Sequence, residues 1–212
     1  MEVIKSFIDL FVHLDHNVAQ LAVHYGQWIY AIVFFIIFAE TGFVITPFLP
    51  GDSLLFVLGA LAAQESLNLG LLLVLLSIAA ISGNMVNYSV GRFLSAKVLS
   101  DSHIPFIKKK YLTRTHTFYE KYGAKTIIIT RFVPIVRTFA PFLAGVGSMS
   151  YGKFTAYNFA GGLLWVLVGV LSGYFFGNLP FVSEHFSLVV LGIVVISLIP
   201  AALEFFKHRR SS

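Results

Sequence analysis

One apolar segment, residues 130–147 with the sequence TRFVPIVRTFAPFLAGVG, restricts the possible folds of this chain more than any other. A straight helix facing lipid would not hold Arg131 and Arg137, because a buried cation costs several kcal/mol. Pro134 and Pro141 each remove a backbone donor. At membrane depth such a segment faces protein or a water-filled cavity. We therefore expect a broken segment that enters and leaves the membrane on the same side.

A second broken segment, residues 38–55 with the sequence FAETGFVITPFLPGDSLL, carries acids instead of arginines. Glu40 follows an apolar run, so we expect its charge to be paired, solvated or neutralised by a proton. Asp52 can also cap a helix that begins at Ser53, since Asp is a favoured N-cap residue. One acidic and one basic broken segment predict a shared polar site. The residues expected to interrupt the helices of both segments are Pro47, Pro50, Gly51, Pro134 and Pro141.

The composition is that of an integral membrane protein. Of the 212 residues, 57% are hydrophobic and 12% are charged, whereas about 25% of a soluble domain is charged. The chain has no cysteine, which removes disulfides, thiolate metal sites and cysteine nucleophiles from consideration. We assign the net charge of +5 to cytoplasmic residues that set the topology. No nucleic-acid partner, metal or cofactor is expected.

The apolar runs predict an all-α membrane protein, a single domain with about four transmembrane helices. The expected spans are residues 28–46, 67–93, 153–176 and 186–206. An interfacial amphipathic helix is expected at 1–27, re-entrant hairpins at 47–64 and 126–149, a connector at 94–125 and a tail at 207–212.

Two patterns lie within these spans. Asn84, Asn87 and Tyr88 fall along one side of the expected helix 67–93, where they are candidates for lining a cavity. Glycines recur every fourth residue near the end of the next span, which predicts close contact between helices. These glycines are Gly169, Gly173 and Gly177.

The basic residues predict the topology. Eight of the fifteen Lys and Arg residues lie between Arg92 and Lys125, so the positive-inside rule places the connector and the tail in the cytoplasm. Counting spans from there puts both termini inside. Residues 126–149 then dip from the cytoplasmic face, and residues 47–64 dip from the outer face. Two opposed hairpins are typical of the inverted repeats of secondary transporters, although the two halves share little sequence.

Three stretches of the chain resemble the bacterial DedA family, also called the SNARE-associated or VTT-domain family. They are FAETGFVITPFLPGDSLL, GNMVNYSVGR and FYEKYGAKTIIITRFVPIVRTFAPFLAGVGSMS. The resemblance implies two opposed re-entrant hairpins among transmembrane helices of the bacterial cytoplasmic (inner) membrane. It also implies functional roles for Glu40, Asp52, Arg131 and Arg137, and transport of a lipid carrier, notably undecaprenyl phosphate, driven by the proton motive force. The chain departs from the family at Asn84, where an aspartate is common, so a proton-carrying role is not transferred to that position.

The leading hypothesis is a transporter, not an enzyme, whose partners are a polyprenyl phosphate, protons and membrane lipids. Arg131, Arg137 and Thr138 would hold the phosphate, because guanidinium groups bind two phosphate oxygens at once. Glu40 and Asp52 would exchange protons. The arginines can instead neutralise the acids in a structural network. Further alternatives are a proton-coupled cation transporter, a lipid phosphatase, for which no nucleophile and base are found, and an assembly factor. A homo-oligomer is left open.

Overall fold

The computed structural model describes residues 27–43, 51–100, 123–147 and 149–177, together with residues 179, 180, 182, 188, 189 and 192. These residues form helices and connecting turns without a strand, which confirms the all-α prediction for this part of the chain. Several predictions fall outside the described residues. They concern Pro47, Pro50, the interfacial helix at 1–27, the connector beyond residue 100, most of the span 186–206 and the tail 207–212.

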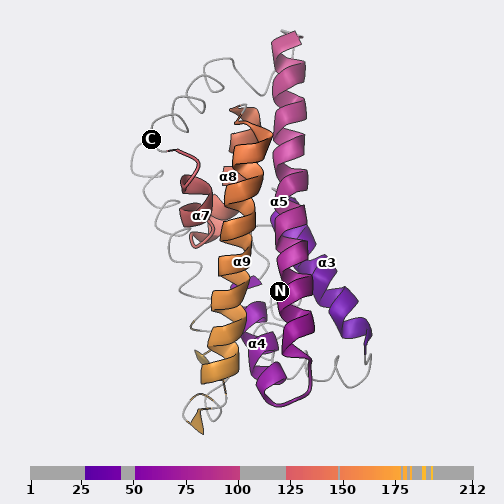
Figure 1. The fold of residues 1–212 in the computed structure, drawn as a ribbon, viewed down its shortest axis with the longest axis vertical. Helices are drawn as coiled ribbons and strands as arrows, with labels where there is room; N and C mark the ends of the chain where they lie inside the picture. Colours follow the sequence, from indigo (N-terminus) through magenta and orange to yellow (C-terminus); the bar gives the residue numbers. More distant parts are fainter. Residues whose placement is uncertain are drawn as a thin grey trace, which may run out of the picture. The chain divides into compact units, whose positions relative to one another are not determined.

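Six helices follow one another among the described residues (Figure 1). They are α3 (Trp28–Gly42), α4 (Gly51–Ala63), α5 (Leu69–Ser100), α7 (Thr126–Thr130), α8 (Pro134–Val146) and α9 (Tyr151–Phe176). The helix α5 continues past residue 93, where the span was predicted to end. The sequence LSAKVLS that follows contains neither glycine nor proline, so nothing in it terminates a helix.

Two of these helices are long and apolar enough to cross a membrane. They are α5 over Leu69–Ser95, with 27 residues, and α9, with 26 residues. Only 39% and 33% of their most apolar windows are buried, whereas the core helix of a soluble protein is mostly buried. Large apolar side chains such as Phe93 and Phe159 are exposed on them, as expected for contact with lipid. The helix α3 has 15 residues and is shorter than a typical span of about 20 residues.

The turn between α4 and α5 is closed by backbone and side-chain hydrogen bonds. Glu65 has a φ of 60°, a left-handed conformation that favours glycine, and Ser66 N–H donates to the carbonyl oxygen of Leu61 at 3.1 Å. This bond is part of a Schellman motif, which satisfies the last carbonyls of a helix. Asn68 then caps α5, because its Oδ1 accepts from the N–H of Leu71 at 2.9 Å.

The chain divides into two compact units. The first unit comprises Met1–Ile36, Phe48–Ser77 and Val166–Ser212, and the second comprises Ile37–Pro47 and Ile78–Trp165. The helices α3, α5 and α9 each contribute residues to both units.

In the first unit, α4 packs against the C-terminal half of α9 without intervening side chains. A Cβ atom added to Gly173 would collide with the carbonyl oxygen of Phe56, and one added to Gly59 would collide with the carbonyl oxygen of Val170. Close contact therefore requires glycine on both helices. The predicted contact is confirmed for all three glycines of the repeat in α9, namely Gly169, Gly173 and Gly177.

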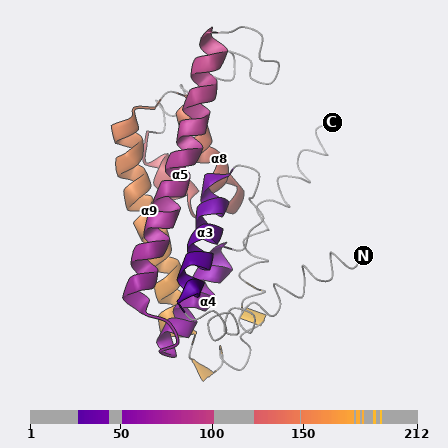
Figure 2. The ribbon, with the colours of Figure 1, turned by 90° about the vertical axis from the view of Figure 1, so that its right-hand side faces the viewer.

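The second unit repeats this reciprocal contact between α8 and α5, which lie side by side (Figure 1, Figure 2). A Cβ atom at Gly145 would collide with the carbonyl oxygen of Tyr88, and one at Gly91 would collide with that of Phe142. Gly91 is as many residues from the start of α5 as Gly173 is from the start of α9. The two units therefore share one internal construction, in which a short helix packs on a long helix through a pair of glycines.

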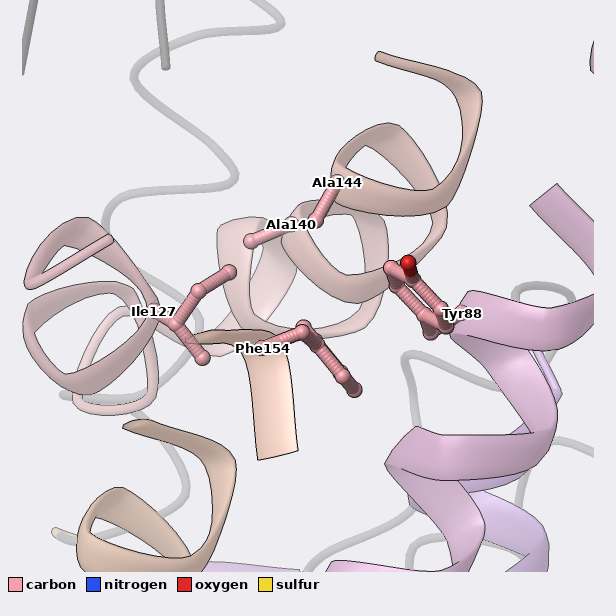
Figure 3. Close-up of a cluster of buried hydrophobic side chains, with 5 residues drawn as sticks. All are labelled: Tyr88, Ile127, Ala140, Ala144 and Phe154. Atoms are coloured by element: carbon pink, nitrogen blue, oxygen red, sulfur yellow. The ribbon is translucent and has the colours of Figure 1, made fainter. Parts of the chain in front are cut away.

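A cluster of buried apolar side chains joins four helices of the second unit (Figure 3). Tyr88 of α5 stacks on Phe154 of α9 with ring centroids 4.2 Å apart. Ile127 from α7 and Ala140 and Ala144 from α8 complete the cluster. Because α7 and α8 are both anchored in it, the break between them has a defined position against α5 and α9.

Candidate functional site

The helix break between α7 and α8 separates the two arginines. The helix α7 ends at Thr130, and α8 begins at Pro134, a residue whose fixed φ suits the first helical position. Val133 has an extended backbone, with φ −113° and ψ 105°, as expected for a residue that precedes proline. Arg131 therefore lies in the break and Arg137 in the first turns of α8. Their side chains are not held on opposite sides of one continuous helix.

Pro141 does not turn the chain, in contrast to the expectation from the sequence. It lies inside α8, which continues to Val146. A proline in a helix interior removes one hydrogen bond and can bend the helix without ending it. The chain leaves the helix at Gly147 instead, whose N–H donates to the carbonyl oxygen of Leu143 at 2.8 Å.

Asp52 also differs slightly from the expectation. The helix α4 begins at Gly51, so Asp52 lies in its first turn and not at the N-cap. A carboxylate in this position still interacts favourably with the helix dipole. Asp52 belongs to the first unit, and its approach to the arginines stays a prediction.

Glu40 and Arg137 form a buried ion pair in the second unit. Nη2 of Arg137 donates to Oε1 of Glu40, and the exposed fractions of the two side chains are 6% and 0%. The pair links the end of α3 to the first turns of α8. The structure thus brings together one acid and one arginine from the four charged residues selected in the sequence. Removing one partner of a buried pair typically costs about 3–5 kcal/mol, so each charge depends on the other.

Arg131 is buried as well, but neutral groups hold it. Its Nη2 donates to Oδ1 of Asn158 at 2.7 Å and to the carbonyl oxygen of Ala80 at 3.1 Å. Its Nε and Nη1 have no acceptor within the described part of the chain. Glu40 is the single acidic residue among the described residues of the second unit, and it contacts Arg137. These residues therefore include one buried cation that no carboxylate balances.

Asn84 is the second amide beside this guanidinium. The orientation of the Asn158 amide is set, because its Nδ2 donates to the carbonyl oxygen of Ile81 at 2.9 Å while its Oδ1 accepts from Arg131. An amide atom of Asn84 lies 2.6 Å from Nη2 of Arg131. If that atom were nitrogen, it would donate to Oδ1 of Asn158 at 3.0 Å. It would then also face Nη2 of Arg131, which is itself a donor, at 2.6 Å. We assign it as oxygen, so that Nδ2 of Asn84 donates to the carbonyl oxygen of Thr41 at 3.3 Å, while the amide oxygens of Asn84 and Asn158 lie 3.0 Å apart and share Nη2 of Arg131 as donor.

Trp165 lies near both guanidinium groups. Its ring centroid is 5.0 Å from Cζ of Arg137 and 6.0 Å from Cζ of Arg131, within the range of cation–π attraction. The sequence analysis selected neither Trp165 nor Asn158, because both lie in a helix interpreted as an ordinary span. The available signals were a polar residue in an apolar helix and a tryptophan far from the helix ends.

Two consecutive glycines of α9 provide the space for the helix break. A Cβ atom at Gly161 would lie 3.2 Å from Cα of Ile128 in α7, and one at Gly162 would lie 2.8 Å from Nη1 of Arg131. Neither glycine was selected from the sequence. Their role depends on which helix faces α9, which no local pattern specifies.

The other polar residues of α5 mainly bind the backbone. Nδ2 of Asn87 donates to the carbonyl oxygens of Thr41 at 3.2 Å and Thr138 at 2.8 Å, and so connects three helices. Thr138, selected as a phosphate ligand, is buried and contributes this carbonyl. The Tyr88 hydroxyl accepts from Nη1 of Arg92 at 2.8 Å. Of the three residues proposed to line a cavity, Asn84 is the one in contact with a site arginine.

These features define an α-helical membrane protein with a buried polar site that contains two arginines and one glutamate. The family model described as VTT domain matches residues 49–175, a range that includes both arginines. Together with the full-length similarity described next, this match shows that the chain belongs to the DedA family of VTT-domain membrane proteins.

The relatives are bacterial proteins, and two of the three described here are named as membrane proteins. The chain is 52% identical to Protein DedA of Escherichia coli K12 over 100% of its own length and 98% of that protein. It is 39% identical to an uncharacterized membrane protein of Mycobacterium tuberculosis over 89% of its length and 85% of the relative. It is 35% identical to the inner membrane protein YqjA of E. coli K12 over 72% of its length and 69% of the relative. No solved structure matches the chain.

Proposed function

We propose that this protein carries a phosphate-bearing polyprenyl lipid, of which undecaprenyl phosphate is the leading candidate, across the bacterial cytoplasmic membrane. One observation supports the proposal above all others. Arg131 is a buried cation that two neutral amides and a backbone carbonyl hold, and its Nε and Nη1 have no acceptor among the described residues. A buried donor without a partner costs about 1–3 kcal/mol, and more when it is charged. A phosphate oxygen would remove that cost.

The chemistry of the site fits a lipid phosphate. A phosphate group accepts strong, directional hydrogen bonds from guanidinium nitrogens. The polyprenyl tail requires a hydrocarbon environment, and large apolar side chains such as Phe93, Phe159 and Phe175 are exposed on the long helices. The head group can therefore enter a polar site while the tail stays in lipid.

The ion pair between Glu40 and Arg137 supplies a means of coupling to protons. Protonation of Glu40 removes its negative charge and weakens its hold on Arg137. Arg137 is then available to bind phosphate beside Arg131, and proton binding favours substrate binding. We assign Asp52 as a second proton carrier on the basis of the family resemblance.

The proposed architecture has two opposed re-entrant hairpins in an inverted repeat, with both termini cytoplasmic. The break before Pro134 supports a discontinuous second hairpin, because such breaks occur where backbone lines a protein-enclosed site. The short helices α4 and α8 pack on long helices through equivalent glycine pairs, which supports the repeat.

Translocation of undecaprenyl phosphate in proteoliposomes, with and without a pH gradient, tests the proposed function. Arg131→Lys and Arg137→Lys keep the positive charge but lose the planar fork, so we expect reduced transport with normal membrane insertion. Arg92→Lys is the matched control, because Arg92 is exposed and its guanidinium donates to a hydroxyl group. Wild-type transport by both site variants would rule out a forked phosphate grip.

Two further measurements define the mechanism. Glu40→Gln resembles the protonated acid but cannot release a proton, so transport by this variant should no longer depend on the pH gradient. If transport by Glu40→Gln still depended on the pH gradient, the proton carrier would be Asp52, or neither acid would carry the proton. The release of inorganic phosphate from the same lipid separates a transporter from a phosphatase, and we expect none.

A further inference from the structure

We propose that Trp165 is a positioning residue that keeps the guanidinium of Arg137 in the site when Glu40 is protonated. This inference rests on the proposed function, in which protonation of Glu40 makes Arg137 available to phosphate. A guanidinium that loses its carboxylate can leave its position, so release alone does not create a binding site. The ring of Trp165 attracts a cation at every pH, because the attraction arises from the negative face of the ring and not from an ionised group.

Trp165 and Glu40 hold the same guanidinium from two helices. Cζ of Arg137 lies 5.0 Å from the centroid of the Trp165 ring, and Nη2 of Arg137 donates to Glu40. Trp165 is 3% exposed and Arg137 is 6% exposed, so little water screens their attraction. The contacts of Arg137 thus include one partner whose charge depends on pH and one whose attraction does not.

Arg131 is the reason that a pH-independent partner is needed. Its Cζ lies 6.0 Å from the centroid of the same ring, so two cations lie close to one aromatic side chain. While Glu40 is ionised, its negative charge offsets the repulsion between them. When Glu40 is protonated, that repulsion favours movement of Arg137 away from Arg131. Attraction to the ring opposes this movement and keeps both guanidinium groups within reach of one phosphate.

Glu40 is the acid whose protonation changes the charge beside the ring. The charged groups that the described elements bring to this part of the site are Glu40 from α3, Arg131 from the helix break and Arg137 from α8. The helices α5 and α9 contribute the neutral amides of Asn84 and Asn158. A pH-dependent change at the ring therefore reports on Glu40.

The first test measures the unfolding temperature of the ligand-free protein in detergent, with fluorinated tryptophan at position 165. Fluorine withdraws electron density from the ring face and so weakens cation–π attraction, while the shape of the ring changes little. The chain has two tryptophans, so Trp28→Phe leaves Trp165 as the sole site of labelling. We expect trifluorination to lower the unfolding temperature by about 2–4 °C more in Glu40→Gln than in the protein with Glu40, because glutamine does not balance the charge of Arg137. A packing role alone would give the same change in both proteins, and that result would overturn the inference.

Trp28 provides the matched control. It is 73% exposed, and fluorination of this residue in a Trp165→Phe background should leave the unfolding temperature unchanged. A decrease as large as that at Trp165 would show a general effect of fluorine and would overturn the inference.

The ¹⁹F NMR signal of singly fluorinated Trp165 gives a second measurement, which does not depend on the folding of Glu40→Gln. As the pH falls, we expect the signal of the protein with Glu40 to shift, because protonation changes the charge beside the ring. A signal that stays constant over the whole pH range in which the protein is folded would contradict the inference.

The affinity for farnesyl phosphate connects this role to the proposed function. In Glu40→Gln, which resembles the protein with protonated Glu40, trifluorination of Trp165 should weaken binding by about tenfold, the loss of most of a desolvated cation–π contact. Single fluorination should weaken it by less, and equal affinity across the series would refute a positioning role in substrate binding. A protein that binds no farnesyl phosphate in any form would instead refute the proposed function. The unfolding temperatures and the ¹⁹F signal would still decide whether Trp165 holds Arg137.

Discussion

The substitution Gly162→Ala tests whether α9 positions Arg131. A Cβ atom at this position would lie 2.8 Å from Nη1 of Arg131 and 2.7 Å from Cγ1 of Ile81. On the same helix, a Cβ atom at Gly152 would meet nothing within 4 Å. The two substitutions add the same methyl group to the same kind of backbone, so Gly152→Ala is a matched control.

The magnitude follows from the contacts around the guanidinium. Ordinary contact begins at 3.4 Å, so Nη1 must retreat by about 0.6 Å to relieve the overlap. The tip of an arginine is flexible, but Nη2 of Arg131 is tied to Asn158 and Ala80, and the bond to Ala80 is already 3.1 Å long. We expect Gly162→Ala to cost about 1–3 kcal/mol through overpacking and a weakened charged hydrogen bond. Gly152→Ala should instead stabilise the exposed first turn of α9 by up to about 1 kcal/mol.

Equilibrium unfolding in detergent, followed by helical circular dichroism, measures both effects. The two alanine variants should shift stability in opposite directions, and Gly162→Ala should also lower the affinity for a phosphate lipid. Equal stabilities of the two variants would show that Arg131 does not lie against α9 as described.

Three further predictions concern other parts of the chain. Glu65→Gly should raise the free energy of unfolding by about 1 kcal/mol, because Glu65 has a left-handed backbone conformation. Gly123→Ala should lower it by a similar amount, because Gly123 has a φ of 72°. A lower thermal unfolding midpoint for Glu65→Gly, or a higher one for Gly123→Ala, would contradict this. Asn87→Leu should cost about 1–3 kcal/mol, because the carbonyl oxygens of Thr41 and Thr138 lose the donor they share, although Thr41 keeps its bond from Asn84. An unfolding midpoint equal to that of the wild type would refute the bridging role. Lys110→Cys, in a chain without cysteine, should react with an impermeant thiol reagent only after the cytoplasmic face is opened, and labelling in intact cells would overturn the proposed topology.

Much of the helical organisation could be predicted from local patterns. Long uninterrupted apolar runs identify α5 and α9, and Pro134 coincides with the break between α7 and α8, because proline suits the first position of a helix. Pro141 was misleading, because a proline can also remain inside a helix whose other hydrogen bonds persist. The predicted span 67–93 agrees closely with the apolar stretch Leu69–Ser95 of α5, and the helix itself continues to Ser100.

The site was less predictable, because its contacts join distant parts of the chain. Charge and depth identified Glu40, Arg131 and Arg137, but no local pattern distinguishes which arginine pairs with the glutamate. That choice depends on how α3 and α8 pack on α5, where Gly83 and Gly91 permit close approach.

The neutral partners of Arg131 were harder still to find. Asn158 and Trp165 appear within an apolar run, and their contacts with the arginines depend on the face that α9 presents to the helix break. Asn84 was selected as a candidate for lining a cavity, but not as a partner of an arginine. Its contact with Arg131 depends on the face that α5 presents to the helix break, which no local pattern specifies.

The central claim is that a lipid phosphate binds the guanidinium of Arg131. The most direct test is solid-state NMR dipolar recoupling between the ³¹P nucleus of bound farnesyl phosphate and ¹⁵N-labelled arginine side chains in proteoliposomes. Hydrogen-bonded phosphate and guanidinium groups should give strong dephasing in the wild type, which Arg131→Lys reduces and Arg92→Lys retains. Binding of the lipid without this dephasing, or dephasing that persists in Arg131→Lys at full strength, would contradict the proposed site.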